Sequence, residues 1–92
     1  MNFEWDAKKA AANLVKHGVS FEEAVTVFAD FGGSTIFDPD HSAGEDRYIT
    51  MGLSNHGRLI VVWHTDRAGA TRLIGARKAN RRETARYTDE RP

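Results

Sequence analysis

The stretch from Arg47 to Arg77 restricts the possible folds more than any other part of the chain. It holds three runs rich in β-branched and aromatic residues, namely Arg47 to Leu53, Arg58 to Thr65 and Ala70 to Arg77. The joints between them, residues 54–57 and 66–69, have the length and composition of hairpin turns. Strands joined so closely pair with their chain neighbours, so the sequence predicts an antiparallel meander.

Two helices are predicted before this meander. Asp6 can serve as the N-cap, and Gly18 as the stop, of a helix over Ala7 to His17. A second helix is expected to begin at Ser20, which would form a capping box with Glu23. Apolar residues at helical spacing mark its buried face: Phe21, Ala24, Val25 and Phe28.

The remaining elements are shorter. We expect strands at Asn2 to Trp5 and at Ser34 to Phe37, and a last helix over Ala79 to Asp89, where Asn80 and Glu83 again have capping-box spacing. The predicted order is strand, two helices, four strands, helix, in one domain spanning residues 1–92. This is an α+β fold with the helices laid on one face of an antiparallel sheet.

The composition places limits on how such a fold is held together. The 92 residues allow a single core, and without cysteine neither a disulfide framework nor a cysteine-rich zinc site can support it. No apolar run approaches the roughly 20 residues that a membrane span needs. The first residues carry no signal-like region, so a cytoplasmic location without membrane contact is expected.

Charge is distributed unevenly along the chain. The totals balance at 13 basic and 13 acidic residues, yet residues 1–57 carry four Lys/Arg against nine Asp/Glu, and residues 58–92 carry nine against four. On the last helix Lys78, Arg82 and Arg86 recur every four residues, with Arg81 beside them. Such a surface can bind a nucleic-acid backbone, or it can be a solvated helix face that pairs with nearby carboxylates. The sequence leaves both readings open.

The four histidines, at positions 17, 41, 56 and 64, differ in what they can do. His17 ends a helix, where a cation is favourable, but it could also move protons in a reaction. His64 alternates with Ile60 and Val62, so it is either a buried residue at the sheet edge or a site residue. Its neighbour Trp63 is expected in the core rather than stacked on a base.

The acidic loop over residues 38–46 suggests a metal site as one hypothesis, because hard cations bind clustered carboxylates. In a calcium loop beginning at Asp38, the glycine would fall at Ala43 and the bidentate glutamate at Ile49, so the register fails. We expect a solvated loop, an ion pair between Glu45 and Arg47, and neither metal nor cofactor. Motifs for hydrolase triads, nucleotide loops and zinc proteases are also missing from the sequence.

Four segments together resemble the BrnT toxin family, in order and over nearly the whole chain. They are Phe3-Glu4-Trp5-Asp6, the stretch from Asn13 to Ala24 with its Lys-His-Gly-Val-Ser-Phe-Glu-Glu-Ala sequence, Asp38-Pro39-Asp40-His41, and the run from Leu73 to Ala79. The resemblance implies a RelE-like fold, with two N-terminal helices packed on a four-stranded antiparallel sheet, a short N-terminal strand and a basic C-terminal helix. One departure is Gly75, where the family is expected often to have serine.

The resemblance also implies a function. It implies a ribonuclease toxin that blocks translation and growth, and a BrnA-like antitoxin with a ribbon-helix-helix domain that would contact DNA, so that the toxin reaches DNA only indirectly. RNA supplies its own nucleophile, the 2′-hydroxyl, so a small basic protein can cleave it without a metal. We expect the antitoxin to cover the basic sheet edge and the last helix.

Residue roles follow from this hypothesis as expectations. Three arginines would hold the scissile phosphate: Arg47, Arg72 and Arg77. Either His17 or His64 would transfer protons, and Tyr87 is a candidate for stacking on a base. The RNA backbone would follow Lys78, Arg81, Arg82 and Arg86. The rival hypothesis is a non-catalytic module whose basic face binds an acidic protein segment in a repressor complex. Direct DNA binding is disfavoured because nothing resembles a recognition helix.

Overall fold

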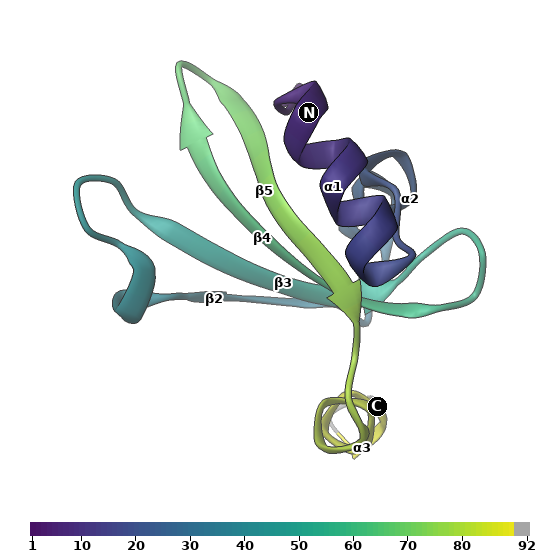
Figure 1. Cartoon of the computed structure of the whole chain (residues 1–92). Coiled ribbons are helices and arrows are strands. Elements are labelled where there is room, and N and C mark those ends of the chain that lie inside the picture. Colours follow the sequence, from purple (N-terminus) through teal and green to yellow (C-terminus); the bar gives the residue numbers. More distant parts are fainter. Residues whose placement is uncertain (90–92) are drawn as a thin grey trace.

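One five-stranded sheet organises the computed structural model, which describes residues 1–89. The strand order across the sheet is β1-β5-β4-β3-β2, and Figure 1 shows the part from β5 to β2. The strands are β1 (Phe3–Glu4), β2 (Ser34–Phe37), β3 (Arg47–Leu53), β4 (Leu59–Arg67) and β5 (Ala70–Lys78). The helices are α1 (Ala7–His17), α2 (Phe21–Thr26) and α3 (Arg81–Asp89), with short 3-10 turns η1 (Val27–Ala29) and η2 (Pro39–His41). The predicted α+β architecture is therefore confirmed.

The predicted meander is present as three antiparallel strands, β3, β4 and β5. Strand β4 continues to Arg67, two residues further than expected, because a tight turn at Ala68 and Gly69 joins it to β5. Both residues have positive φ, 49° and 83°, the geometry that suits the right-handed twist of a two-residue hairpin.

No helix among residues 1–89 has the length and apolarity to cross a membrane.

The outer edge of β5 is covered in two different ways. Strand β1 pairs with it in parallel, Phe3 opposite Thr71 and Glu4 opposite Arg72. Further along, the Asn13 side chain of α1 replaces a strand, because its amide oxygen accepts from Ala76 N at 3.1 Å and its amide nitrogen donates to Ala76 O at 2.9 Å. The sheet is consequently five-stranded and mixed, which corrects the prediction of a four-stranded antiparallel sheet beside a separate N-terminal strand.

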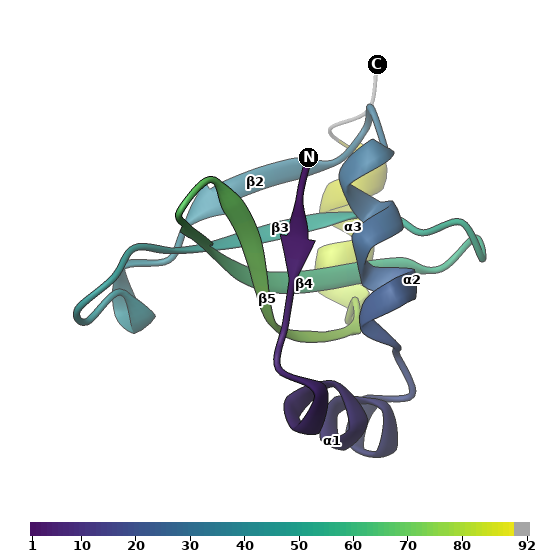
Figure 2. The same cartoon turned by 90° about the horizontal axis from the view of Figure 1, so that it is seen from above.

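Helices cover both faces of the sheet, which corrects the prediction that they share one face. Helices α1 and α2 lie on one side and α3 on the other (Figure 1), and from above α3 lies behind the strands that α2 covers (Figure 2). We call these sides the α2 face and the α3 face. The α2 face holds the larger core, which includes Phe21, Ile60, Val62 and Leu73. The reason is that β3 and β4 carry apolar residues on both sides, so the α3 face also needs a cover.

Helix α3 packs on the second, smaller core, in which Tyr87 contacts Met51 and Val61. The Tyr87 hydroxyl donates to Asp30 Oδ2 at 2.5 Å. The same oxygen of Asp30 accepts from Leu53 N at 2.7 Å, so one carboxylate joins the turn after α2, the end of β3 and the last helix. Tyr87 is the one fully buried residue of α3 as far as the structure describes that helix.

A β-bulge interrupts the pairing of β4 with β5. Trp63 lies opposite Gly75 and His64 opposite Leu73, which leaves Ile74 without a partner. In a regular strand, residues 72 and 77 would point to opposite faces because they are an odd number apart. The bulge adds one residue, so both Arg72 and Arg77 lie opposite odd-numbered residues of β4 and share the α3 face.

The helix starts show where local sequence signals are sufficient. Asp6 caps α1 by accepting from Lys9 N, and Gly18 ends it with a φ of 69°, both as predicted. Asn80 and Glu83 form both bonds of a capping box at α3. At α2 the box is only half formed, because Ser20 accepts from Glu23 N while the Glu23 carboxylate turns inward.

That carboxylate belongs to a buried polar network. Glu23 is 4 % exposed, and its Oε2 accepts from Ser54 Oγ at 2.7 Å and from Arg58 Nε at 2.9 Å. Arg58 also donates to Glu23 Oε1 and to Gly18 O. The Arg58 guanidinium above all lowers the pKa of Glu23 from 4.5 to about 2, and the Ser54 hydroxyl adds to this against the opposing effect of burial. The network ties α2 to the β3–β4 turn.

This network predicts an acid-sensitive component of stability. The folded pKa of Glu23 lies below its unfolded value, so its contribution is complete above about pH 5 and is lost as the pH falls toward 2. Roughly 3 kcal/mol should disappear over that interval. Urea unfolding at several pH values measures it. Glu23→Gln should have a lower free energy of unfolding at pH 7, and that free energy should change less between pH 5 and 2. If its pH dependence stayed the same as in the unmodified protein, the assignment to Glu23 would be contradicted.

Candidate functional site

Four side chains form one row across the α3 face, each from a different strand. The register places Arg47 of β3 opposite Thr65 of β4, Thr65 opposite Arg72 of β5, and Arg72 opposite Glu4 of β1. Neighbouring strands lie about 4.8 Å apart, so the Cα atoms of Arg47 and Arg72 are roughly 10 Å apart. Arginine side chains of that separation can converge on one small anion above Thr65, whose side chain is buried and donates to Asp46 O.

The arginines of this row differ in whether they form an ion pair. Arg72 Nη1 donates to Glu4 Oε2 at 2.8 Å. Arg47, by contrast, has no carboxylate within ion-pair distance in the described part of the chain, although an ion pair with Glu45 was predicted. Glu45 instead accepts from Arg67, its Oε1 from Nη2 at 3.1 Å and its Oε2 from Nε at 3.2 Å. This bonding to Arg67, with smaller contributions from Arg47 and Arg72, lowers the pKa of Glu45.

Arg77 lies further along the same face and is held on two sides. Its guanidinium lies over the Trp63 ring, 5.1 Å from the centroid, and its Nη1 and Nη2 atoms contact the two oxygens of Glu83 at 2.8 and 3.0 Å. This fork lowers the pKa of Glu83, and the backbone at Asn80 lowers it further against the effect of burial. Arg77 is thus rigidly placed, since a stacked and doubly bonded guanidinium has little rotamer freedom left.

The space between α3 and the arginine row is open and apolar. Ile36 and Ile49 face each other across β2 and β3, and Ile49 faces Trp63 across β3 and β4. Ile36 is 50 % exposed, while Ile49 and Trp63 are half-buried. The α3 face therefore offers fixed guanidinium groups beside an aromatic and aliphatic floor, which suits a ligand with both phosphates and flat rings. Trp63 is half-buried and packs against the second core, so the expected core position is confirmed in part.

The remaining basic side chains predicted for the site are at the end of β5 and on α3. Lys78, Arg81, Arg82 and Arg86 are all exposed. Arg86 lies close enough to Glu83 to help lower the pKa of that carboxyl. Lys78 lies opposite Ile60 and therefore on the α2 side of β5, whereas the three arginines place positive charge on the exposed surface of α3.

Tyr87 is not placed for base stacking, which corrects that expectation. Its ring is 7 % exposed and packs against Met51 and Val61, and its hydroxyl is bonded to Asp30. A stacking platform needs an accessible ring face. Tyr87 instead attaches α3 to the sheet.

His64 lies on the α2 face, away from the arginine row. It is 6 % exposed, with its ring between Phe28 and Tyr48, and its Nε2 atom is 2.7 Å from Thr50 Oγ1. Burial lowers the pKa of His64, so the ring is neutral near pH 7. Within residues 1–89 its Nδ1 atom has no hydrogen-bond partner. Of the two readings left open by the sequence, the structure shows the buried one.

His17 lies at the C-terminal end of α1, where it lines a shallow pocket with Lys9, Asn13, Lys16 and Ile74. This pocket adjoins the edge of β5 and not the row of Arg47 and Arg72. The structure therefore brings the three predicted arginines onto one face, and it places neither predicted histidine beside them.

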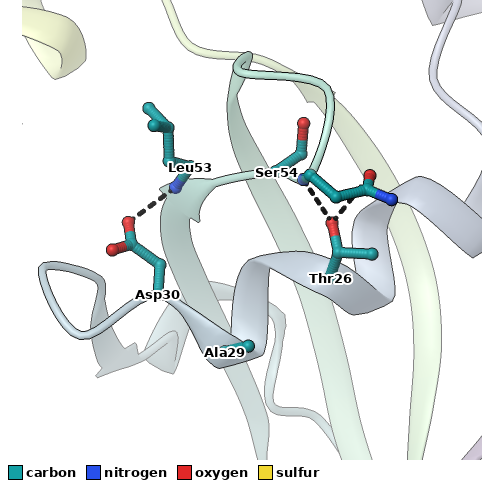
Figure 3. A pocket seen from close by; sticks show the side chains of 6 residues that line it. Thr26, Ala29, Asp30, Leu53 and Ser54 are labelled. Carbon is teal, nitrogen blue, oxygen red and sulfur yellow. Dashed lines mark hydrogen bonds between the residues drawn. The ribbon is translucent and has the colours of Figure 1, made fainter.

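A second pocket lies between η1 and the turn that joins β3 to β4 (Figure 3). Its polar side chains are bonded within the fold: Asp30 accepts from Leu53 N, and Thr26 Oγ1 accepts from Asn55 N and donates to Glu23 O. Figure 3 shows Asp30 directed at the Leu53 backbone in this way. Groups committed to the fold are poor candidates for chemistry, so the arginine row remains the candidate site.

Sequence reasoning missed three members of the site. Glu4 reaches the site because β1 pairs in parallel with β5 over only two residues, and no local sequence pattern predicts that pairing. Arg67 and Trp63 could have been found, because both share the period-two alternation of Val61 and Thr65 on β4. Gly75, where the family is expected to have serine, has room for a side chain. A Cβ there would contact only Asn13 Oδ1, at 3.8 Å.

Comparisons with known proteins agree on one family. Residues 5–83 match the family described as "Ribonuclease toxin, BrnT, of type II toxin-antitoxin system". The crystal structure of the Brucella abortus ribonuclease toxin BrnT resembles this fold with a TM-score of 0.66 and 25 % sequence identity, covering 88 % of this chain and 99 % of the other. No curated protein sequence matches the chain.

The position of Tyr87 leads to a prediction about stability. Tyr87→Phe keeps the ring and removes the hydroxyl that binds Asp30, so the free energy of unfolding should fall by about 1–2 kcal/mol. Denaturant unfolding measures the loss. Thr88→Ala, at the neighbouring exposed position, serves as the control and should have a smaller effect. Stability equal to that of the unmodified protein would mean that this bond does not anchor α3.

Proposed function

The chain belongs to the BrnT family of ribonuclease toxins of type II toxin-antitoxin systems, and from that premise we propose that its arginine row binds and cleaves RNA. The reaction proposed is metal-independent cleavage inside the RNA chain, in the cytoplasm, which would stop translation and growth. The observation that carries this proposal is that Arg47, Arg72 and Arg77 share one face of the sheet, with Arg47 and Arg72 in the same row.

The chemistry requires little more than positioning and charge stabilisation. The 2′-hydroxyl of RNA attacks the adjacent phosphorus, the bond to the 5′ oxygen breaks, and a 2′,3′-cyclic phosphate remains. Extra negative charge develops on the pentacoordinate phosphate, and guanidinium groups fixed in advance stabilise it at no further reorganisation cost. One such donor typically contributes 10²–10³-fold in rate. Two or three arginines are therefore sufficient for a substantial effect.

The three arginines contribute differently under this proposal. Arg47 has no carboxylate partner in the described residues, and Arg72 has only its Nη1 atom engaged, so both retain donors for a phosphate. Arg77 already contacts both oxygens of Glu83, and its role is to stabilise charge from a fixed position. We propose Arg47 and Arg72 as the phosphate clamp.

The rest of the α3 face would hold the flanking nucleotides. Ile36 and Ile49, beside the Trp63 ring that Arg77 covers, provide an apolar surface against which a base can pack. The exposed cations at the end of β5 and on α3 would follow the RNA backbone: Lys78, Arg81, Arg82 and Arg86. Affinity for RNA should therefore fall steeply with salt, since each neutralised phosphate releases counterions.

A type II toxin has an antitoxin partner, and we propose a BrnA-like protein with a ribbon-helix-helix domain in that role. DNA contact would come through the antitoxin. Inhibition is simplest if the partner covers the α3 face, because its exposed apolar residues, such as Ile36, and its unpaired arginine donors would otherwise both remain open. Binding and inhibition would then be one event.

Cleavage of RNA is the direct test. Purified protein incubated with a long RNA in excess chelator should produce fragments ending in a 2′,3′-cyclic phosphate and a 5′-hydroxyl. Arg72→Gln should slow cleavage on the order of 10²-fold. Lys8→Gln removes one positive charge from the exposed surface of α1 and serves as the matched control. RNA left intact by the unmodified protein would refute the metal-free reaction.

The partner proposal has its own measurement. Trp5→Phe leaves Trp63 as the single tryptophan, and it reports on the α3 face. Addition of the protein encoded next to the toxin should shift the Trp63 emission and abolish cleavage at the same stoichiometry. Inhibition without any change in emission would place the antitoxin elsewhere. If Arg77→Gln lost partner binding while the unmodified protein never cleaved RNA, the non-catalytic module would be favoured.

A further inference from the structure

We infer that Glu4 is the general base that removes the proton from the attacking 2′-hydroxyl. This inference rests on the proposed ribonuclease function, which requires a proton acceptor close to the arginine row. The two histidines predicted for that task lie elsewhere, His64 buried on the α2 face and His17 at the end of α1. The acceptor must therefore be another side chain on the α3 face.

Three glutamates lie close to the arginines of this face, and they differ in how many hydrogen bonds their oxygen atoms accept. Both oxygens of Glu45 are bonded to Arg67, and both oxygens of Glu83 are bonded to Arg77, with Oε1 of Glu83 also accepting from Asn80 N. Every oxygen of these two carboxylates already accepts a charge-assisted hydrogen bond, so a proton transferred to either one would compete with its arginine. Glu45 and Glu83 are structural partners of their arginines.

Glu4 has a different arrangement. Its Oε2 accepts from Arg72 Nη1 at 2.8 Å, while Oε1 has no hydrogen bond or ion pair within residues 1–89. The side chain is 41 % exposed, so a bound substrate can reach it. One oxygen thus fixes the orientation of the carboxylate and the other is available as an acceptor.

Glu4 also lies at one end of the arginine row, directly beside Arg72. Glu4 lies opposite Arg72, the next strand out from the phosphate clamp, with Cα atoms about 5 Å apart. A phosphate held by Arg47 and Arg72 would have its ribose within reach of a group at one end of the row. The arrangement resembles other activated nucleophiles, in which the base is itself oriented by a third group.

The proposed step transfers one proton to Glu4 and replaces one bond to phosphorus by another. Glu4 Oε1 accepts the proton of the 2′-hydroxyl as the bond from the 2′ oxygen to phosphorus forms. The bond from phosphorus to the 5′ oxygen breaks, and a water molecule donates a proton to the departing oxygen. Arg72 remains bonded to Glu4 and to the phosphate, which couples the base to the charge that develops there.

Glu4→Gln separates a base from a residue that only positions Arg72. The amide oxygen of glutamine can still accept from Arg72, but the amide accepts no proton at neutral pH. Single-turnover cleavage should fall about 10²–10⁴-fold, the usual contribution of a general base. Binding of an RNA analogue with 2′-deoxyribose at the cleavage position should change less than about threefold. Glu4→Asp, which keeps a carboxylate, should recover part of the rate.

The pH dependence provides a second readout. The cleavage rate of the unmodified protein should be lower in acid, because a protonated carboxyl group cannot accept the 2′ proton, and Glu4→Gln should lack this dependence. Glu22→Gln, the same change on the exposed side of α2, should alter neither rate nor profile.

The outcomes distinguish this inference from the function on which it rests. No cleavage by the unmodified protein would refute the proposed function and the inference with it. Normal cleavage by the unmodified protein, with Glu4→Gln within about threefold of it, would overturn the inference alone. Equal losses of rate and analogue affinity, with the pH profile retained, would make Glu4 a positioning residue and would also overturn it.

Discussion

The extra residue at Ile74 is the constraint on which the site depends. Two-residue alternation would direct Arg72 and Arg77 to opposite faces of β5, and one of them would then enter the core beneath α1 and α2. The bulge moves the alternation by one position between them. Leu73 and Ala76, only three residues apart, consequently both remain in the core of the α2 face. One irregularity thus satisfies the core and gathers the arginines.

The same irregularity has to be stabilised at the edge of the sheet, because β5 is almost an outer strand. Bulges weaken a ladder locally, and an edge with unpaired backbone groups would fray there. Strand β1 covers the part before the bulge at Thr71 and Arg72, and Asn13 covers the part after it at Ala76. Helix α1 therefore does more than fill the core, since its amide side chain completes the strand that carries Arg77.

Local patterns predicted the elements well and their arrangement less well. The meander, the caps at Asp6 and Gly18 and the box at Asn80 and Glu83 depend on residues close in sequence, and all were predicted. The Glu23 carboxylate left its predicted box because Arg58, 35 residues away, offers a better partner for a buried charge. Helix α3 is held on its face by the buried Tyr87, by the bond from Tyr87 to Asp30, and by the fork between Arg77 and Glu83.

The candidate arginines were proposed from residue type alone, and the side chains that pair with them were not. Arginines were expected because guanidinium groups bind phosphate, and that reasoning needs no geometry. The choice of a proton acceptor does need geometry. Histidine has the usual pKa for the task, so His17 and His64 were the natural candidates, yet the face on which a residue lies follows from register and not from its titration. Register places Glu4 in the row and His64 behind it.

The internal ion pairs of the site explain how a protein with equal numbers of acidic and basic residues can still act on a polyanion. Arg67, Arg72 and Arg77 are each paired with a glutamate, so the resting face is far less positive than its arginines suggest. These partners cost affinity, because a phosphate competes with a carboxylate for the same donors. They also hold each guanidinium in one orientation, which reduces the ordering that a substrate must impose. Among the described residues, Arg47 without an ion pair and the free donors of Arg72 are then where a phosphate meets least competition, beside Glu4 with its open Oε1.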